Sequence, residues 1–421
     1  MKTIREPARD IPVVREVDVA VVGGGTAGVA AGVAAARAGA DTLLIERYSC
    51  LGGQMTGGYV VMLPGEPWCY DVGIPIFGGI ASEIVDRLKG EDAIWYPDGP
   101  GALWFDPEIM KWLAIDLMEG AGAKMRLHSW VCNVIMKGPR IEALVVESKG
   151  GRHAIKVKSV VDASGDCDVA FFSGAAYETA RRNISLEGKA YVSDPEAWHA
   201  FFKERGRDFW WSLHEMGVEA GVGSSMYKRC PGILLSDISW PLGCASEGFL
   251  DGLDVDDLTM IENESRKYFK KMVDYHRANV PGCRDMVLVE SSSQLGVRET
   301  RRAVGDHIYT NEEMNGHVKF DDCIGRFGEP DSYFEIPYGS IYSKDVENLW
   351  VAGRCISTDH EAQGFVRIIP ACILTGEAAG TAAALSTKNG CCPARELDVE
   401  LLVDELISHG VALRDQVARI P

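Results

Sequence analysis

The amino-acid sequence predicts an α/β fold in which a Rossmann-like nucleotide-binding domain is assembled from segments near both ends of the chain. Three observations support this prediction: a glycine-rich strand–helix–strand unit over 18–46, a helix followed by three strands over 106–165, and a glycine-bearing strand with a small-residue helix over 346–385. The 421 residues are expected to form two or more lobes, because single cores rarely exceed about 250–300 residues.

The strand–helix–strand unit contains the spacing Gly23-x-Gly25-x-x-Gly28 directly after an apolar strand. Glycines at these places let the backbone turn tightly and approach a pyrophosphate, and the helix N-terminus adds free N–H groups and a positive dipole end. Glu46 closes the second strand, where a carboxylate can accept hydrogen bonds from ribose hydroxyls. In this context the fingerprint predicts a dinucleotide cofactor; an ordinary glycine-rich turn is the alternative.

Composition and charge narrow the classes of partner. The net charge of −18 argues against nucleic acid and against an anionic membrane surface. No apolar run reaches transmembrane length, and residues 1–15 have no apolar signal region, so we expect a cytoplasmic protein without membrane insertion. The 12 cysteines form no CxxC pair and no metal-binding spacing, so we predict no metal site.

The remaining elements follow in chain order. The glycine-rich segment 51–58 predicts backbone packed closely against a flat group, and residues 59–82 are expected to form a loop. A helix is predicted over 106–121, with Asp106 as its N-cap and Pro107 at its first position. Three strands with polar turns are predicted over 125–138, 140–150 and 152–165.

Beyond about residue 175 the hydrophobic periodicity weakens. An amphipathic helix is predicted over 258–278, a strand over 333–341 and another over 347–354. The small residues of 370–385 predict a final helix.

Several segments resemble one known family. The segments LGGQMTGG at 51–58, VVDASGDCDVA at 160–170, VRETRRAVGD at 297–306 and the stretch 346–384 are similar to segments of FAD-dependent oxidoreductases, which are distantly related to succinate dehydrogenase, fumarate reductase and the glutathione reductase fold. The resemblance implies FAD bound by a glutathione reductase-type domain with a β-meander, split by an inserted α+β substrate domain. The chain order agrees, because NAD-binding halves continue with repeated βαβ units and this chain does not; NAD alone is the less favoured cofactor.

The resemblance also implies a division of the chain. FAD-binding parts are expected at 1–60, 106–174 and 341–390, an insert at 61–105, a substrate or cap domain at 175–340 and a C-terminal helix or tail at 391–421.

Cofactor contacts are expected by the same resemblance, with Arg354 standing where related flavoenzymes often have an acid for a ribityl hydroxyl. Arginine cannot accept a hydrogen bond, so Arg354 is expected to donate to phosphate or to face the substrate. The expected cofactor-binding residues are Gly23, Gly25, Thr26, Ala27, Gly28, Glu46, Arg47, Gly53, Gln54, Thr56, Val131, Ala163, Ser164, Gly165, Gly353 and Arg354.

The candidate catalytic residues are His360, Arg298, Arg301 and Arg367. Arginine can clamp a carboxylate with two hydrogen bonds, and histidine titrates near neutral pH. Structural ion pairs for the arginines, a loop role for His360 and a flavin phosphate partner for Arg367 are the alternatives.

The sequence thus predicts an FAD-dependent oxidoreductase that transfers a hydride between flavin N5 and a small polar substrate by dehydrogenation of CH–OH or CH–CH. A carboxylate- or carbonyl-bearing substrate or a ring-shaped polyol is expected. The tryptophans Trp68, Trp95, Trp104, Trp210 and Trp211 are expected to pack in the core, with stacking on a ring-shaped substrate as the alternative. The alternatives are an ene-reductase fed by a partner donor and a non-catalytic flavin electron carrier. The substrate, the electron acceptor and homo-oligomerisation stay open.

Overall fold

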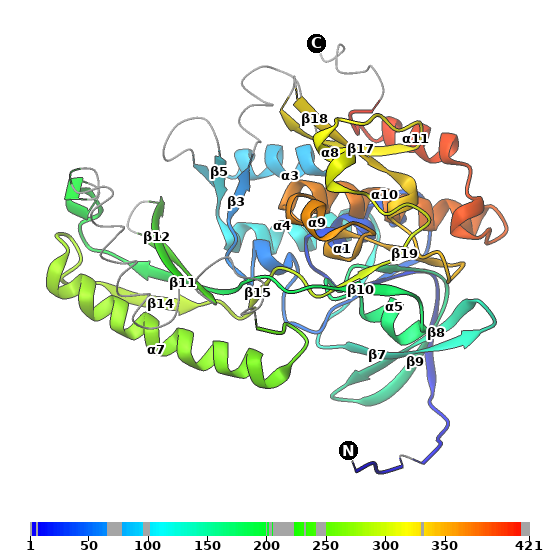
Figure 1. Ribbon diagram of the computed structural model, residues 1–421, viewed down its shortest axis with the longest axis horizontal. Coiled ribbons are helices and arrows are strands. Elements are labelled where there is room, and N and C mark those ends of the chain that lie inside the picture. Colours follow the sequence, from blue (N-terminus) through cyan, green and yellow to red (C-terminus); the bar gives the residue numbers. More distant parts are fainter. Residues whose placement is uncertain are drawn as a thin grey trace.

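A computed structural model of the protein describes residues 2–5, 7–64, 78–95, 102–198, 200–201, 204, 223–230, 233–240, 250–329 and 332–413. Two lobes lie side by side in Figure 1, and the lobe at the right contains elements from both ends of the chain. The lobe at the left is built from the middle of the chain.

The right-hand lobe is organised around a sheet with a parallel centre. Its strands run in the order β6-β2-β1-β9, and β19 pairs with the C-terminal half of β9 on the edge opposite β1. Strands β2 and β19 and the C-terminal halves of β1 and β9 are mostly buried, which explains their apolar sequences, whereas the short edge strand β6 is not. Their bounds are β1 Val13–Val22, β2 Thr42–Ile45, β6 Lys124–Arg126, β9 Gly151–Asp162 and β19 Leu349–Val351.

The predicted three-stranded meander is confirmed. Strands β7 (Trp130–Lys137) and β8 (Arg140–Ser148) pair antiparallel with each other, and β8 pairs with the N-terminal half of β9. Strand β9 therefore belongs to both the meander and the parallel sheet.

Two small-residue helices cover the parallel sheet and pack against each other. They are α1 (Thr26–Arg37) and α10 (Ile369–Lys388), which confirms the helix expected over 370–385. A Cβ added at Gly376 or Gly380 of α10 would lie 2.2 Å from the carbonyl oxygen of Ala27 or Ala31, so the two backbones nearly touch. Helix α10 is apolar and long enough to cross a membrane, but its apolar stretch is entirely buried within the protein.

Further elements surround this core. Helix α4 (Pro107–Gly120) begins as predicted, since the Asp106 carboxylate accepts the Glu108 N–H at 2.8 Å. Strand β3 (Met62–Pro64) and the start of helix α3 (Gly79–Gly90) fall within the expected loop 59–82, so that prediction is wrong at its ends. Both elements lack a periodic apolar signal there: β3 is very short, and α3 begins at two positive-φ glycines.

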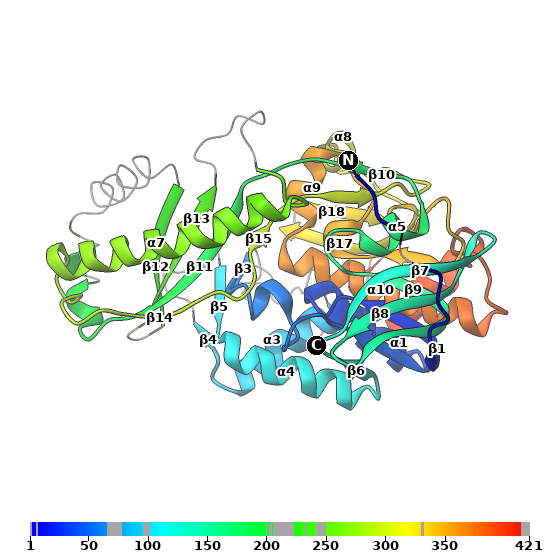
Figure 2. The ribbon, with the colours of Figure 1, turned by 90° about the horizontal axis from the view of Figure 1, so that it is seen from below.

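The left-hand lobe has its own sheet and core. The strand order is β12-β13-β11-β14, and α7 (Val255–Asn279) crosses one face of the sheet in Figure 2. Phe269 of α7 fills the space above Gly188, where a Cβ would lie 2.6 Å from its ring. The helix predicted over 258–278 is thus confirmed. The strands are β11 Ile184–Tyr191, β12 Gly223–Cys230, β13 Ile233–Trp240 and β14 Val287–Ser291, with β15 Gly296–Val297 also paired to β11.

Short elements connect the lobes and complete the larger one. Strand β18 confirms the start of the strand predicted over 333–341. These elements are β4 Ile94–Trp95, β5 Ala102–Phe105, α5 Asp168–Ser173, β10 Tyr177–Thr179, β16 Arg301–Ala303, α8 Asn311–Asn315, β17 Cys323–Glu329, β18 Ser332–Pro337, α9 His360–Val366 and α11 Val399–Ser408.

Candidate active site

The glycine-rich turn between β1 and α1 is shaped by close backbone contacts. Gly23 has φ +96°, and a Cβ there would lie 2.4 Å from the carbonyl oxygen of Ala163. At Gly25 the space is open, because an added Cβ would meet only the Cα of Gly53, at 4.0 Å. Gly25 is also the N-cap of α1 and provides no side-chain acceptor, so the first N–H groups of the helix are left for another acceptor.

Glu46 lies at the end of β2 and is 7% exposed. Its Oε2 accepts the Gly24 N–H at 2.5 Å, and its Oε1 accepts the Tyr48 N–H at 2.7 Å. These bonds hold the carboxylate beside the glycine turn, where its remaining lone pairs can accept hydroxyl donors.

The segment after β9 forms the facing wall. The buried carboxylate of Asp162 accepts the Ser164 N–H and O–H through Oδ1 and the N–H groups of Val169 and Ala170 through Oδ2. One side chain therefore fixes the turn that contains Gly165, whose φ is +84°.

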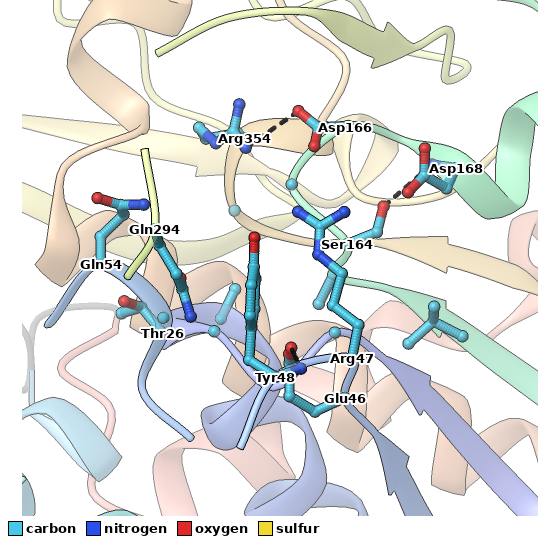
Figure 3. A pocket seen from close by; sticks show the side chains of 18 of the residues that line it. Thr26, Glu46, Arg47, Tyr48, Gln54, Ser164, Asp166, Asp168, Gln294 and Arg354 are labelled. Atoms are coloured by element: carbon cyan, nitrogen blue, oxygen red, sulfur yellow. Dashed lines mark hydrogen bonds and ion pairs between the residues drawn. The ribbon is translucent and has the colours of Figure 1, made fainter. Parts of the chain in front are cut away.

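A cleft of about 1110 Å³, part of it open to solvent, joins these segments. Figure 3 shows Gln54 and Gln294 at one side of this pocket and Asp168 at the opposite side, with Arg47 and Tyr48 between them. The predicted site residues that line the cleft are Gly23, Gly25, Thr26, Ala27, Glu46, Arg47, Gly53, Gln54, Val131, Ala163, Ser164, Gly165, Gly353, Arg354 and Arg367.

Two expected cofactor residues do not line the cleft and support it instead. A Cβ at Gly28 would lie 1.8 Å from the carbonyl oxygen of Gly23, so this glycine lets α1 pass over the turn. The Thr56 hydroxyl donates to the Leu51 carbonyl at 2.5 Å and closes the loop that carries Gly53.

Arg354 lies against Gly165, where a Cβ would be 2.5 Å from Nη2. Its Nη2 is 3.1 Å from Oδ1 of Asp166 (Figure 3), so a protein carboxylate takes one side of the guanidinium. Nη1 is buried and has no hydrogen-bond partner among the described residues.

Arg298 and Arg301 lie outside the cleft lining. Arg301 Nη1 donates to the Asp166 carbonyl at 2.9 Å and to Asp168 Oδ1 at 3.0 Å, and its guanidinium stacks 4.2 Å from the Phe171 ring centre. Arg298 Nη1 donates to the Asn183 carbonyl at 3.1 Å. The Arg301 contacts brace the wall that carries Asp166 and Asp168.

His360 also lies outside the cleft lining, beside a buried carboxylate that the sequence analysis did not select. Glu299 has no exposed side-chain surface; its Oε2 accepts Arg182 Nε at 2.7 Å, and its Oε1 pairs with Arg302. His360 Nδ1 is 2.8 Å from the same Oε2, within ion-pair range although not aligned for a hydrogen bond. Glu299 thus ties α9 to the arginine-rich segment.

The prediction from the sequence did not include several other residues that line the cleft, although some of them belong to or adjoin recognised segments. Asp166 and Asp168 belong to the 160–170 segment, and Trp130 precedes Val131. Gln294 had no signal, because it stands outside the recognised segments, three residues before the one at 297–306. Burial, together with Asp162 and Asp166, raises the pKa of Asp168 to about 6.

Among the tryptophans of the described residues, only Trp130 lines the cleft and could stack on a bound ring there. Trp95 and Trp104 lie on strands β4 and β5, away from the cleft lining. Trp68, Trp210 and Trp211 lie outside the described residues.

The residues present fit an extended dinucleotide. The open space at Gly25, the N–H groups of α1 and the orphaned Arg354 Nη1 lie along one cleft and offer donors to phosphate or ribityl oxygens. The chain belongs to the family of FAD dependent oxidoreductases, whose model matches residues 18–406. It is therefore an FAD-dependent enzyme, as the sequence predicts.

Among curated relatives, the chain is similar to thiamine thiazole synthase of Methanococcus aeolicus, at 34% identity over 170 residues, which cover 37% of this chain and 57% of that protein. It is also similar to digeranylgeranylglycerophospholipid reductase 1 of Methanopyrus kandleri, at 31% identity over 163 residues, with 36% and 40% covered. The chain thus spans only about half the length of the curated relatives it matches.

Solved structures share the fold over most of the chain. A geranylgeranyl bacteriochlorophyll reductase-like protein from Thermoplasma acidophilum matches with a TM-score of 0.51 and 14% identity over 94% of this chain and 83% of its own. A p-nitrophenol 4-monooxygenase from Pseudomonas putida has the same TM-score, 10% identity and coverage of 94% and 85%.

Proposed function

We propose that this enzyme dehydrogenates a CH–OH or CH–CH bond of a small polar organic substrate by hydride transfer to the N5 atom of FAD. The observation that carries the proposal is the course of the cleft. It includes the glycine turn of α1, and Gln54, Gln294 and Arg367 line it as well, so polar side chains from three separate parts of the chain face one cleft. A few convergent polar groups of this kind suit the orientation of a polar substrate.

FAD supplies the acceptor for the hydride. The chain's own residues bind and orient it in this proposal: the N–H groups of α1 bind the pyrophosphate, Glu46 binds the adenosine ribose, and the segment from Gly353 contacts the ribityl region. Their positions along one cleft support these assignments.

We also propose the domain division given by the sequence, with the FAD-binding parts at 1–60, 106–174 and 341–390 around a substrate domain at 175–340. The pairing of β19 with β9 supports a cofactor domain drawn from both chain ends.

Oxidation of a CH–OH group to a carbonyl releases one hydride, which the oxidised cofactor accepts, and one proton from the hydroxyl. We assign that proton to His360. It begins α9, seven residues before Arg367, and residues seven apart lie on the same face of a helix. The carboxylate of Glu299, whose Oε2 lies 2.8 Å from His360 Nδ1, would stabilise the protonated ring electrostatically. Arg298 is proposed to contact substrate and Arg301 to support the wall.

The reverse direction, reduction of an activated C=C bond with electrons from a partner donor, is the second candidate. It is supported by the reductases among the relatives, which match over 36% of this chain.

An anaerobic visible spectrum of the purified protein separates these candidates. We expect a flavin band that bleaches when a hydroxy acid, a sugar or a cyclic alcohol is added. A band that none of them bleaches, but that enoates restore after chemical reduction, would favour the ene-reductase. A flavin that neither treatment affects would favour an electron carrier, and failure to bind FAD after reconstitution would refute the cofactor site.

A further inference from the structure

The cleft contains an arginine, Arg367, whose charge is not balanced by any carboxylate in the described part of the chain. Arg367 is the C-cap residue of α9 and lines the cleft beside Gly353 and Cys372. Its Nε atom is buried without a hydrogen-bond partner, and no carboxylate among the described residues lies within ion-pair distance of it. The residue as a whole is partly buried, and a partly desolvated charge without a counter-charge is destabilising, so a ligand is the natural source of compensation.

The positive charges around Arg367 make binding of an anion beside its guanidinium more favourable. Burial and the nearby charges of Arg298, Arg182 and Arg354 lower the pKa of Arg367 to about 10. Helix α10 begins two residues later at Ile369, which also lines the cleft and brings the positive end of the helix dipole.

The carboxylates near Arg367 and its neighbouring arginines already form ion pairs with other side chains. Glu299 is paired with Arg182 and Arg302 and lies beside His360, and Asp166 is paired with Arg354. Neither lies within ion-pair distance of Arg367, so the local excess of positive charge contrasts with the net charge of −18 of the whole chain.

We propose that Arg367 binds the carboxylate of the substrate, so that the enzyme acts on small organic acids. The proposal rests on the proposed hydride transfer for its substrate class, but the anion site itself does not. Arginine suits this role, because its planar guanidinium can bind both carboxylate oxygens at once. A second source of negative charge, the phosphates of FAD, would satisfy the same guanidinium.

Binding of carboxylates to the FAD-loaded enzyme tests the site without turnover. Benzoate and acetate, which have no CH–OH or saturated CH–CH bond to oxidise, are each compared with their neutral amide in a titration that follows the flavin absorption band. We expect both acids to perturb the band and both amides to bind at least about tenfold more weakly, because a charge-assisted hydrogen bond is about twice as strong as a neutral one. Equal binding of acids and amides would overturn the proposal.

Substitution of Arg367 identifies which anion it serves. In Arg367→Met we expect carboxylate affinity to fall by about tenfold or more, whereas the affinity of apoprotein for FAD changes less than about threefold. Arg367→Lys keeps the charge and is expected to lose less. Arg87→Met is the matched control, since it removes an arginine paired with Asp116 outside the cleft.

The opposite pattern would assign Arg367 to the cofactor: FAD affinity lost and carboxylate affinity unchanged. If Arg367→Met does not fold, the comparison of acid with amide in the wild-type enzyme and in Arg367→Lys still decides the question. If hydroxy acids bind and perturb the flavin but never bleach it, the anion site stands and the proposed dehydrogenation fails.

Discussion

Gly28 shows how one hydrogen atom in place of a methyl group shapes the cofactor site. A Cβ at this position would lie 1.8 Å from the carbonyl oxygen of Gly23, and that oxygen belongs to a turn that cannot move without disturbing the cleft. We expect Gly28→Ala to weaken FAD binding by about tenfold or more, because overpacking costs about 1–3 kcal/mol. Flavin content after purification and FAD titration of the apoprotein measure the effect.

The control is Gly90→Ala, at the end of α3. Nothing lies within 4 Å of an added Cβ there, so flavin content should match the wild type. Full flavin occupancy in Gly28→Ala would contradict the role of this turn.

The residue types in the sequence did not show which side chains would line the cleft and which would only support its walls. Arg47 and Arg301 follow equally suggestive motifs, yet Arg47 lines the cleft and Arg301 bonds to the wall behind it. The difference is one of side-chain direction, which depends on the packing of α5 and β16. Glu299 was missed because two of its three neighbours, Arg182 and His360, come beside it only in the folded chain.

At the scale of elements, the contact between α1 and α10 determines how the two ends of the chain meet. We expect Gly380→Ala to destabilise the protein by about 1–2 kcal/mol, because the clash of its methyl group with the Ala31 carbonyl outweighs the gain in helix propensity. Urea unfolding of the FAD-loaded protein measures the change.

Gly120→Ala at the end of α4 provides the comparison. An added Cβ there meets nothing within 4 Å, and we expect unchanged or slightly higher stability. An equal loss in both variants would show that the close approach of α1 and α10 is unimportant.

At the scale of the whole molecule, Glu377 makes stability depend on pH. It is 1% exposed in α10, and its Oε2 accepts the Ile80 N–H of α3 at 3.0 Å. Burial raises the pKa of Glu377 to about 8; the Ile80 N–H and Arg37 oppose this rise, and Glu83 adds to it. The folded state therefore keeps a proton that the unfolded chain releases above about pH 4.5.

This contribution to the free energy of unfolding is fully present below pH 4.5 and is lost as the pH rises through about 8, with a total on the order of 5 kcal/mol. We expect Glu377→Gln, which keeps an acceptor for Ile80, to flatten the fall in unfolding free energy between pH 5 and 9. The same fall in both proteins would exclude Glu377 as its cause.

The cofactor class, the strand–helix–strand unit, the meander and the late helix could be predicted from the sequence, because they depend on local glycine spacing and on apolar periodicity. Which residues line the cleft together depends on how the chain folds in three dimensions. The parallel pairing of β19 with β9 brings Gly353, Arg354 and Arg367 to the turn that contains Gly23, more than 300 residues earlier in the chain. Such contacts between distant segments depend on the packing of α1 on α10, and this packing leaves no periodic signal in either segment alone.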